Sequence, residues 1–187
     1  YFINLYIMRQ LILLLLFIPL VSISQDFRKM SFGESVENLK EKYPNIKFDE
    51  EKNANITHLG HEDFVNGIKT TIVYSFKDNK LVVGGYSFEY LNDDNGLKNY
   101  KSFSEILNAK YKMEENNIWH NDTFKDSPNN HSHSLKMGYV VFYERYAGED
   151  KMISHSIFQA EGGLMHMATY VDIEFATLMG QANEDDF

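Results

Sequence analysis

The stretch that decides the fold runs from Leu59 to Phe76 and has the sequence LGHEDFVNGIKTTIVYSF. Asn66 and Gly67 at its centre form a dipeptide that readily adopts the positive φ angles of a two-residue hairpin turn. After this turn, alternate residues fall on one face of an extended chain, namely Ile68, Thr70, Ile72, Tyr74 and Phe76. A period of two is typical of a strand with one face against a core. The stretch therefore predicts an antiparallel hairpin with one buried face.

Similar patterns extend this hairpin in both directions. Asp78 and Asn79 predict a second tight turn, which leads into a strand from Lys80 to Leu91 with a bulge or bend at Gly84 and Gly85. Upstream, Ser31 and Glu34 have the spacing of a capping box, which predicts a helix from Phe32 to Lys42. The polar segment from Asn45 to Asn55 has no period and predicts a loop.

The second half of the chain repeats this order of elements. Helical spacing predicts a helix from Leu97 to Tyr111, followed by a minor strand at Ile118 and Trp119 and a long mobile loop from Asn121 to Ser134. Three longer strands are then predicted, at Leu135 to Tyr146, Lys151 to Gln159 and Leu164 to Phe175. In the last of these, His166 and Tyr170 fall on the face opposite Met165 and Met167, and we expect them to point outward.

Two segments, Glu37 to Tyr43 and Glu105 to Tyr111, share Glu, Leu, Lys and Tyr at matching places. Since the order of helix and strands recurs as well, the sequence predicts two α-β-β-β repeats, at about 27–96 and 97–179. The predicted fold class is α+β, with both repeats in one antiparallel sheet and the helices packed on one face.

The N-terminal residues have the outline of a secretory signal peptide. Met8 and Arg9 precede an apolar run from Leu11 to Val21, and the small residues Ser22 and Ser24 follow it. The sequence therefore predicts a signal peptide with upstream residues at 1–24, a single α+β domain at 25–179 and a disordered acidic tail at 180–187. An uncleaved membrane anchor is the alternative. The expected location is periplasmic or secreted.

Composition limits the classes of partner and of site. The net charge is −9, which disfavours binding to nucleic acid and to anionic membranes. There is no cysteine, so disulfides, thiolate metal sites and a lipid-modified cysteine are all excluded. The expected partner is an envelope protein or a glycan, without nucleic acid and without stable membrane insertion after cleavage.

Short motifs for catalysis or metal binding are weak. His58 and His61 would face opposite sides of a strand, and His131 and His133 lie in the predicted mobile loop, so we expect solvated histidines and no metal. There is no Gly-x-Ser-x-Gly elbow, phosphate-binding glycine loop or dinucleotide fingerprint. We therefore predict no cofactor and assign no catalytic residue.

The remaining candidate site is a set of aromatic side chains on the strands. One face of the sheet is expected to stay uncovered, and exposed aromatic residues are common anchors for partners. The predicted binding residues are Tyr86, Tyr90, Tyr139, Tyr143, His155, His166 and Tyr170. The predicted function is that of an exported, non-catalytic binding or accessory protein. The alternatives are an envelope hydrolase that uses His155, His166 and nearby carboxylates, and a structural subunit of a surface complex.

Three segments carry a resemblance to known proteins: Phe27 to Ser35, Tyr74 to Leu81, and Lys110-Tyr111 with Trp119. They resemble exported proteins of the Bacteroidota. The tandem layout of helix and strands is similar to that of the β-lactamase inhibitor protein and, in each half, to that of the small outer-membrane assembly lipoproteins. The resemblance implies a fold only, because this chain lacks the disulfides of the inhibitor and the lipid-anchoring cysteine of the lipoproteins.

Overall fold

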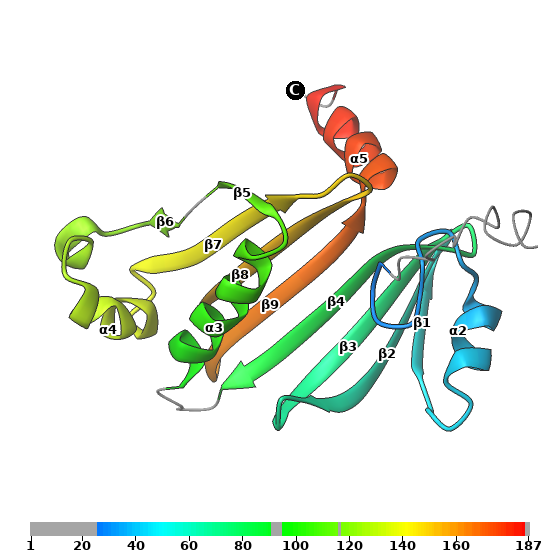
Figure 1. The fold of residues 1–187 in the computed structure, drawn as a ribbon, viewed down its shortest axis with the longest axis horizontal. Coiled ribbons are helices and arrows are strands. Elements are labelled where there is room, and N and C mark those ends of the chain that lie inside the picture. The colour runs from blue at the N-terminus through cyan, green and yellow to red at the C-terminus, as the bar shows by residue number, and fades with distance from the viewer. Residues whose placement is uncertain (1–25, 91–94, 116, 186–187) are drawn as a thin grey trace, which may run out of the picture.

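The computed structural model describes residues 26–90, 95–115 and 117–185. Its centre is one antiparallel sheet, against which helices pack (Figure 1). The order of the strands is β1-β2-β3-β4-β9-β8-β7-β5, and β6 pairs with β7. This arrangement confirms the predicted α+β class. The predicted signal peptide at 1–24 lies outside the described residues. No helix in the described part of the chain is long and apolar enough to span a membrane.

The hairpin predicted around Asn66 and Gly67 is confirmed. It joins β2 (Ile56–Val65) to β3 (Ile68–Lys77), and the two turn residues have φ angles of 52° and 78°. The predicted turn at Asp78 and Asn79 also has two positive φ angles and leads into β4 (Lys80–Tyr90). On β3 the buried side chains are those of the predicted inner face, namely Thr70, Ile72, Tyr74 and Phe76.

Two details of this half differ from the prediction. The bulge lies between Ser75 and Phe76 rather than at Gly84. Gly84 instead allows a close approach, since a Cβ atom there would lie 2.2 Å from Cδ1 of Phe27. The predicted loop from Asn45 to Asn55 contains an edge strand, β1 (Asp49–Asn53), whose residues are all exposed. Such a strand leaves no alternating pattern in the sequence.

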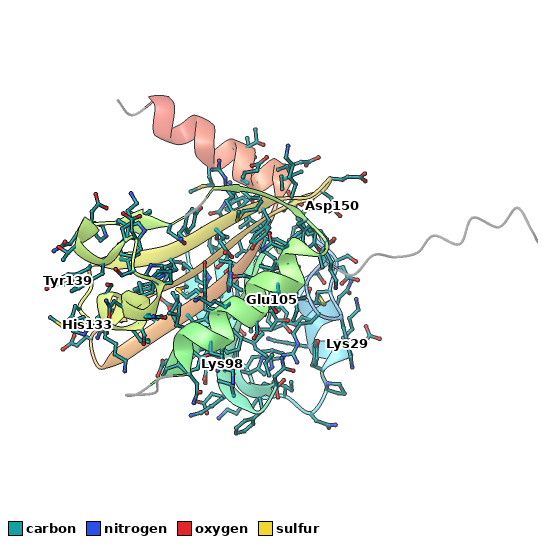
Figure 2. All side chains as sticks on the ribbon, turned by 60° about the vertical axis from the view of Figure 1, so that its left-hand side comes forward. Lys29, Lys98, Glu105, His133, Tyr139 and Asp150 are labelled. Carbon is teal, nitrogen blue, oxygen red and sulfur yellow. The ribbon has the colours of Figure 1, made fainter. Side chains whose placement is uncertain are left out.

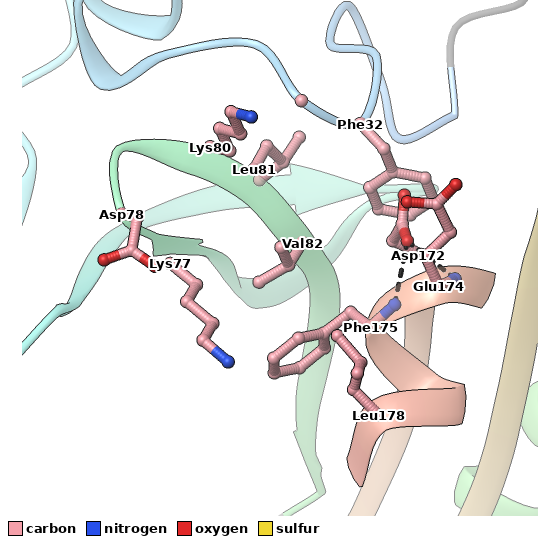
Figure 3. Close-up of a pocket in the computed structure, with 11 residues that line it drawn as sticks. Phe32, Lys77, Asp78, Lys80, Leu81, Val82, Asp172, Glu174, Phe175 and Leu178 are labelled. Carbon is pink, nitrogen blue, oxygen red and sulfur yellow. Dashed lines mark hydrogen bonds between the residues drawn. The ribbon is translucent and has the colours of Figure 1, made fainter.

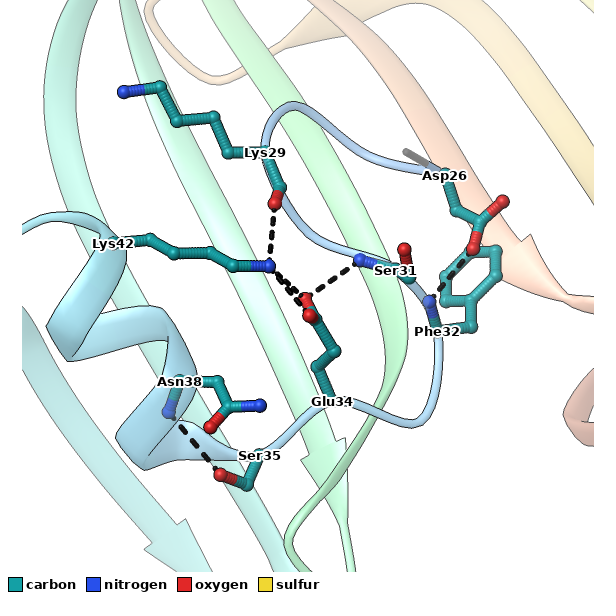
Figure 4. A network of polar contacts seen from close by, with 8 residues as sticks. All are labelled: Asp26, Lys29, Ser31, Phe32, Glu34, Ser35, Asn38 and Lys42. Carbon is teal, nitrogen blue, oxygen red and sulfur yellow. Dashed lines mark hydrogen bonds and ion pairs between the residues drawn. The ribbon is translucent and has the colours of Figure 1, made fainter. Parts of the chain in front are cut away.

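Helix α2 (Val36–Lys42) begins four residues later than predicted, because Gly33 has a φ angle of 84° and cannot continue a helix. Its N-cap is Ser35, whose hydroxyl accepts a hydrogen bond from the backbone N–H of Asn38 at 3.3 Å. The predicted contact from Glu34 to the backbone N–H of Ser31 is present at 2.9 Å. It holds the turn before the helix, where Glu34 also pairs with Lys42 (Figure 4).

The second half begins with α3 (Gly96–Asn108) and contains more structure than predicted. Between β6 (Ile118–Trp119) and β7 (Val140–Ala147), the expected mobile loop and the start of the expected strand form short helices. Leu135 is fully buried in one of them, which fixes the segment against the core. The elements not yet named are β5 (Lys112–Glu115), η1 (Asp122–Phe124), η2 (Pro128–Asn130), α4 (His131–Lys136), β8 (Lys151–Ala160) and β9 (Gly163–Asp172).

The last predicted strand ends early. The carboxylate of Asp172 accepts hydrogen bonds from the backbone N–H groups of Glu174 and Phe175, at 2.8 and 3.0 Å. This cap starts α5 (Ile173–Asp185), so the predicted disordered tail is helical up to Asp185. In Figure 1, α5 leaves the end of β9 and extends beyond the sheet.

The predicted repeat is not confirmed. Each half has a helix followed by a run of strands, and the last strands of the two halves, β4 and β9, pair at the centre of the sheet. However, α2 has 7 residues and α3 has 13, and only the second half contains η1, η2 and α4.

One face of the sheet carries the core, and we call it the covered face. Leu39 of α2 packs on the N-terminal strands, while Leu97 and Tyr100 of α3 pack on β4, β7, β8 and β9. Phe27 in the N-terminal segment contacts the rings of Tyr74, Tyr86 and Tyr170 over the central strands. An ion pair between the buried side chains of Asp26 and Lys151 ties this segment to β8.

Candidate functional site

The opposite face of the sheet, which we call the open face, consists of the side chains that alternate with the core residues. Across β3, β4, β9 and β8 none of these residues is buried, whereas most of their neighbours in sequence are. The strand register aligns Thr71, Ser87, Met167 and Ser156 in one row across the sheet. A second row contains Val73, Gly85, Thr169 and Ser154.

Charged side chains are absent from the central part of the open face within these described strands. The central residues are Thr71, Val73, Ser75, Val83, Gly85, Ser87, Met152, Ser154, Ser156, Phe158, Met165, Met167, Thr169 and Val171. Charged residues of this face lie toward its margins, where Glu62, Lys69, Lys77, Glu89 and Arg145 are found. The centre is therefore an uncharged surface of short hydroxyl side chains with methionine, valine and one phenylalanine.

The seven predicted binding residues do not form this surface. Tyr86, Tyr90, His155, His166 and Tyr170 all lie on the covered face, and only Tyr143 projects from the open face. Tyr139 lies just before β7 beside α4 (Figure 2), where its backbone carbonyl accepts hydrogen bonds from His120 and Asn121.

The predicted outward position of His166 and Tyr170 is thus wrong. The alternation along β9 is present, but aromatic residues of α3 and of the N-terminal segment cover the face that we expected to be open. Phe103 and Tyr100 contact the ring of His166, and Phe27 contacts that of Tyr170. The sequence signal that favoured the wrong face was the higher hydropathy of the methionines and valine on the other side of the strand.

The structure does bring together the histidines and a carboxylate that formed the alternative site. Nε2 of His155 lies 2.7 Å from Nε2 of His166, and Nδ1 of His155 lies 3.1 Å from Oε2 of Glu144. The hydroxyls of Ser104 and Tyr146 donate to the same carboxylate oxygen, at 2.6 and 2.7 Å. These side chains come from α3, β7, β8 and β9, so no short motif could have revealed them.

Protonation in this cluster follows from its geometry. Burial would raise the pKa of Glu144, but hydrogen bonds from His155, Ser104 and Tyr146 outweigh it and leave the pKa below its ordinary value. Burial lowers the pKa of His155, and burial with the neighbouring His155 lowers that of His166 to about 3. At neutral pH both rings are therefore neutral beside a carboxylate.

The positions of the protons then follow in order from Glu144. Nδ1–H of His155 donates to the carboxylate, so its Nε2 is an acceptor. Nε2–H of His166 donates to that acceptor, which leaves Nδ1 of His166 as a hydrogen-bond acceptor. This atom lies 3.5 Å from the hydroxyl oxygen of Tyr90.

The cluster does not have the geometry of a serine hydrolase. In such enzymes the serine and the carboxylate contact opposite nitrogens of the histidine. Here Ser104 lies 3.4 Å from Nδ1 of His155, the same nitrogen that faces Glu144. The exposed fractions of His155 and His166 are 0% and 1%. The cluster is a hydrogen-bonded part of the core.

A groove of about 560 Å³ lies between α5 and the β3–β4 turn (Figure 3). Phe175 and Leu178 of α5 face Val82 across it, and the ammonium group of Lys77 lies 5.5 Å from the centre of the Phe175 ring. Leu178 is exposed. The groove thus combines apolar walls with charges at its margin.

Metal-ligand clusters and similarities to known proteins give no independent indication of function. The described residues contain no group of three or more histidine, aspartate or glutamate side chains that could hold a metal ion. Comparisons with family models, curated proteins and solved structures found no match.

Proposed function

We propose that this chain is a non-catalytic binding protein, and that a protein or glycan partner is held on the open face. The observation that carries the proposal is the uncharged centre of that face, in a chain with 24% charged residues. The centres of protein interfaces are depleted of charged residues and enriched in methionine and aromatic side chains. Charges at the margin of the face would then form the polar rim.

Export to the periplasm or to the outside of the cell is part of this proposal. It is supported by the apolar run from Leu11 to Val21 and its flanking residues. The resemblance to exported proteins of the Bacteroidota likewise predicts export.

An envelope hydrolase is the second candidate, because Glu144, His155 and His166 are hydrogen-bonded in one cluster. The complete burial of His155 and the position of Ser104 favour the binding protein instead. A hydrolase would need the histidine beside its carboxylate within reach of a substrate.

A charge placed in the centre of the open face tests the proposal. The tagged wild-type chain is used to capture partners from extracts of its source cells, in parallel with Met167→Glu and with Met137→Glu as the control. Both methionines are exposed, at 37% and 52%, but Met137 follows α4 and lies off the sheet. Both variants should therefore unfold at nearly the wild-type temperature.

We expect a partner that binds the wild type and Met137→Glu but is lost from Met167→Glu. The same pair of variants should discriminate in the same way on a glycan array if the partner is a glycan. A partner that binds all three proteins equally would show that the open face is not the interface.

A further inference from the structure

A second hollow opens on the covered side, between α3 and the β2–β3 hairpin. It has a volume of about 110 Å³ and apolar walls from Val65, Ile68, Phe88, Phe103 and Ile106. His166 and Tyr90 also line it. Asn66, Ile68, Tyr90 and Asn99 line an adjoining open hollow of about 500 Å³ as well, together with Asn95 and Glu89. An apolar interior with a polar mouth is typical of small-molecule sites.

The size of the inner hollow limits the ligand to about one ring. An apolar protein cavity of about 150 Å³ accommodates a benzene molecule. The inner part is slightly smaller than that, and its opening toward the adjoining hollow provides additional room. A flat aromatic ring suits the walls, because both Phe88 and Phe103 line the hollow, where their rings pack edge-to-face with their centres 6.3 Å apart.

The polar atom at the inner end selects the chemistry of the ligand. Nδ1 of His166 is an acceptor at neutral pH, because the hydrogen bonds from Glu144 through His155 assign the proton to Nε2. The hydroxyl of Tyr90 lies at 3.5 Å, the longest distance for a hydrogen bond, so a shorter bond from a ligand can compete with it. An anion would face a lone pair here, and a cation would lose its water among apolar walls.

From these contacts we infer that the cleft binds a small neutral molecule with a single ring and a hydroxyl group, such as a phenol, whose hydroxyl donates to Nδ1 of His166. The ring lies against the side chains of Phe88 and Phe103, and Ile106 borders its entrance. This site is separate from the open face, so neither proposal depends on the other.

Wild-type protein titrated with phenol, anisole and benzoate tests the site by nuclear magnetic resonance. Anisole keeps the ring but cannot donate a hydrogen bond, and benzoate carries a negative charge. Phenol should shift the amide signals of Phe88, Tyr90, Phe103 and His166 with saturation. Anisole should bind about fivefold more weakly, as expected for the loss of one neutral hydrogen bond, and benzoate should not bind.

A matched pair of variants locates the bound phenol. Ile106→Trp places an indole at the entrance, while Ile118→Trp adds the same ring at a site on β6 of equal exposure, 50% against 49%. We expect phenol to bind at least tenfold more weakly to Ile106→Trp and unchanged to Ile118→Trp. Equal affinity for phenol and anisole, equal affinity of the two variants for phenol, or shifts confined to the open face would each overturn the inference.

Discussion

The two halves of the sheet both bury histidine on the covered face, but they bond it differently. In the N-terminal half, His61 is 6% exposed and stacks 6.1 Å from the ring of Tyr74, and neither of its ring nitrogens has a hydrogen-bond partner among the described residues. In the C-terminal half, His155 and His166 bond to each other and to Glu144. His61 packs as one ring of an aromatic core, whereas His155 and His166 belong to a polar network.

This difference shows that the role of a buried histidine depends on the side chains around it. We expected His58 and His61 to be solvated. They lie on opposite faces of β2, as predicted for a strand, and His61 is buried. His58 bonds to Ser75 on the open face, at 2.8 Å. An unpaired buried polar group costs about 1–3 kcal/mol, so the two halves should respond differently to the same kinds of change.

The largest expected effect is that of Glu144→Ala. The change leaves the buried donors of Ser104, Tyr146 and His155 without their shared acceptor, and we expect a loss of about 3–5 kcal/mol in the free energy of unfolding. Urea unfolding followed by circular dichroism measures it. A loss below about 1 kcal/mol would mean that the network does not support the C-terminal half.

Cavity formation should affect the two halves alike. Leu39 of α2 and Leu107 of α3 are both essentially inaccessible, at 0% and 2% exposure. Leu39→Ala and Leu107→Ala should each lower the free energy of unfolding by about 2–5 kcal/mol. If only one variant is destabilised, when both are compared by urea unfolding, one helix contributes little to the core.

Acid should weaken the C-terminal half through its histidines. Because the pKa of His166 is lowered from 6.5 to about 3, the unfolded chain binds more protons than the folded chain between these values, and stability falls as the pH falls. From pH 7 to pH 5 this histidine alone accounts for a loss of about 2 kcal/mol. His155 and His61 act in the same direction.

The comparison across this pH range uses urea unfolding at constant ionic strength. The wild type should lose stability steadily below about pH 6.5, and His166→Gln should show a shallower dependence. A wild-type stability that stays constant from pH 7 to pH 5 would contradict the neutral, buried state of the ring.

The smallest expected effect is that of His61→Phe. Since neither ring nitrogen is bonded to a described residue, phenylalanine keeps the stacking on Tyr74 and removes two unpaired polar atoms. We expect a change within about 1 kcal/mol, toward higher stability, whereas His155→Phe should be clearly destabilising. Thermal unfolding of the two variants side by side checks this. Equal losses in both would remove the distinction between the two halves.

Local sequence predicted the hairpins because their turns are local. The residue types of Asn66-Gly67 and Asp78-Asn79 favour positive φ angles without help from distant contacts. Alternation along β3 correctly predicted which of its side chains are buried. The helix from Leu97 was likewise close to α3. The edge strand β1 and the helix α4 were missed, because the first has no buried side and the second is held by the burial of Leu135.

The candidate site could be predicted only in part. The sequence indicated His155, His166 and carboxylates as one alternative, and the structure adds Glu144 as the partner. Ser104 was not found, since its contact with Glu144 joins α3 to β7, and Tyr146, two residues from Glu144 on β7, was assigned no role. The set of aromatic residues was assigned to the wrong face of the sheet.

What the sequence by itself determined is therefore the class of fold, the turns and which residues share a face of each strand, because these depend on neighbours along the chain. Only the tertiary structure decided which face is covered. That choice depends on where α3 and the N-terminal segment pack, and the rings of Phe27, Tyr100 and Phe103 bury His166 and Tyr170 although methionine and valine occupy the other side. Burial is a property of packing between distant segments, and alternation along one strand leaves both choices open.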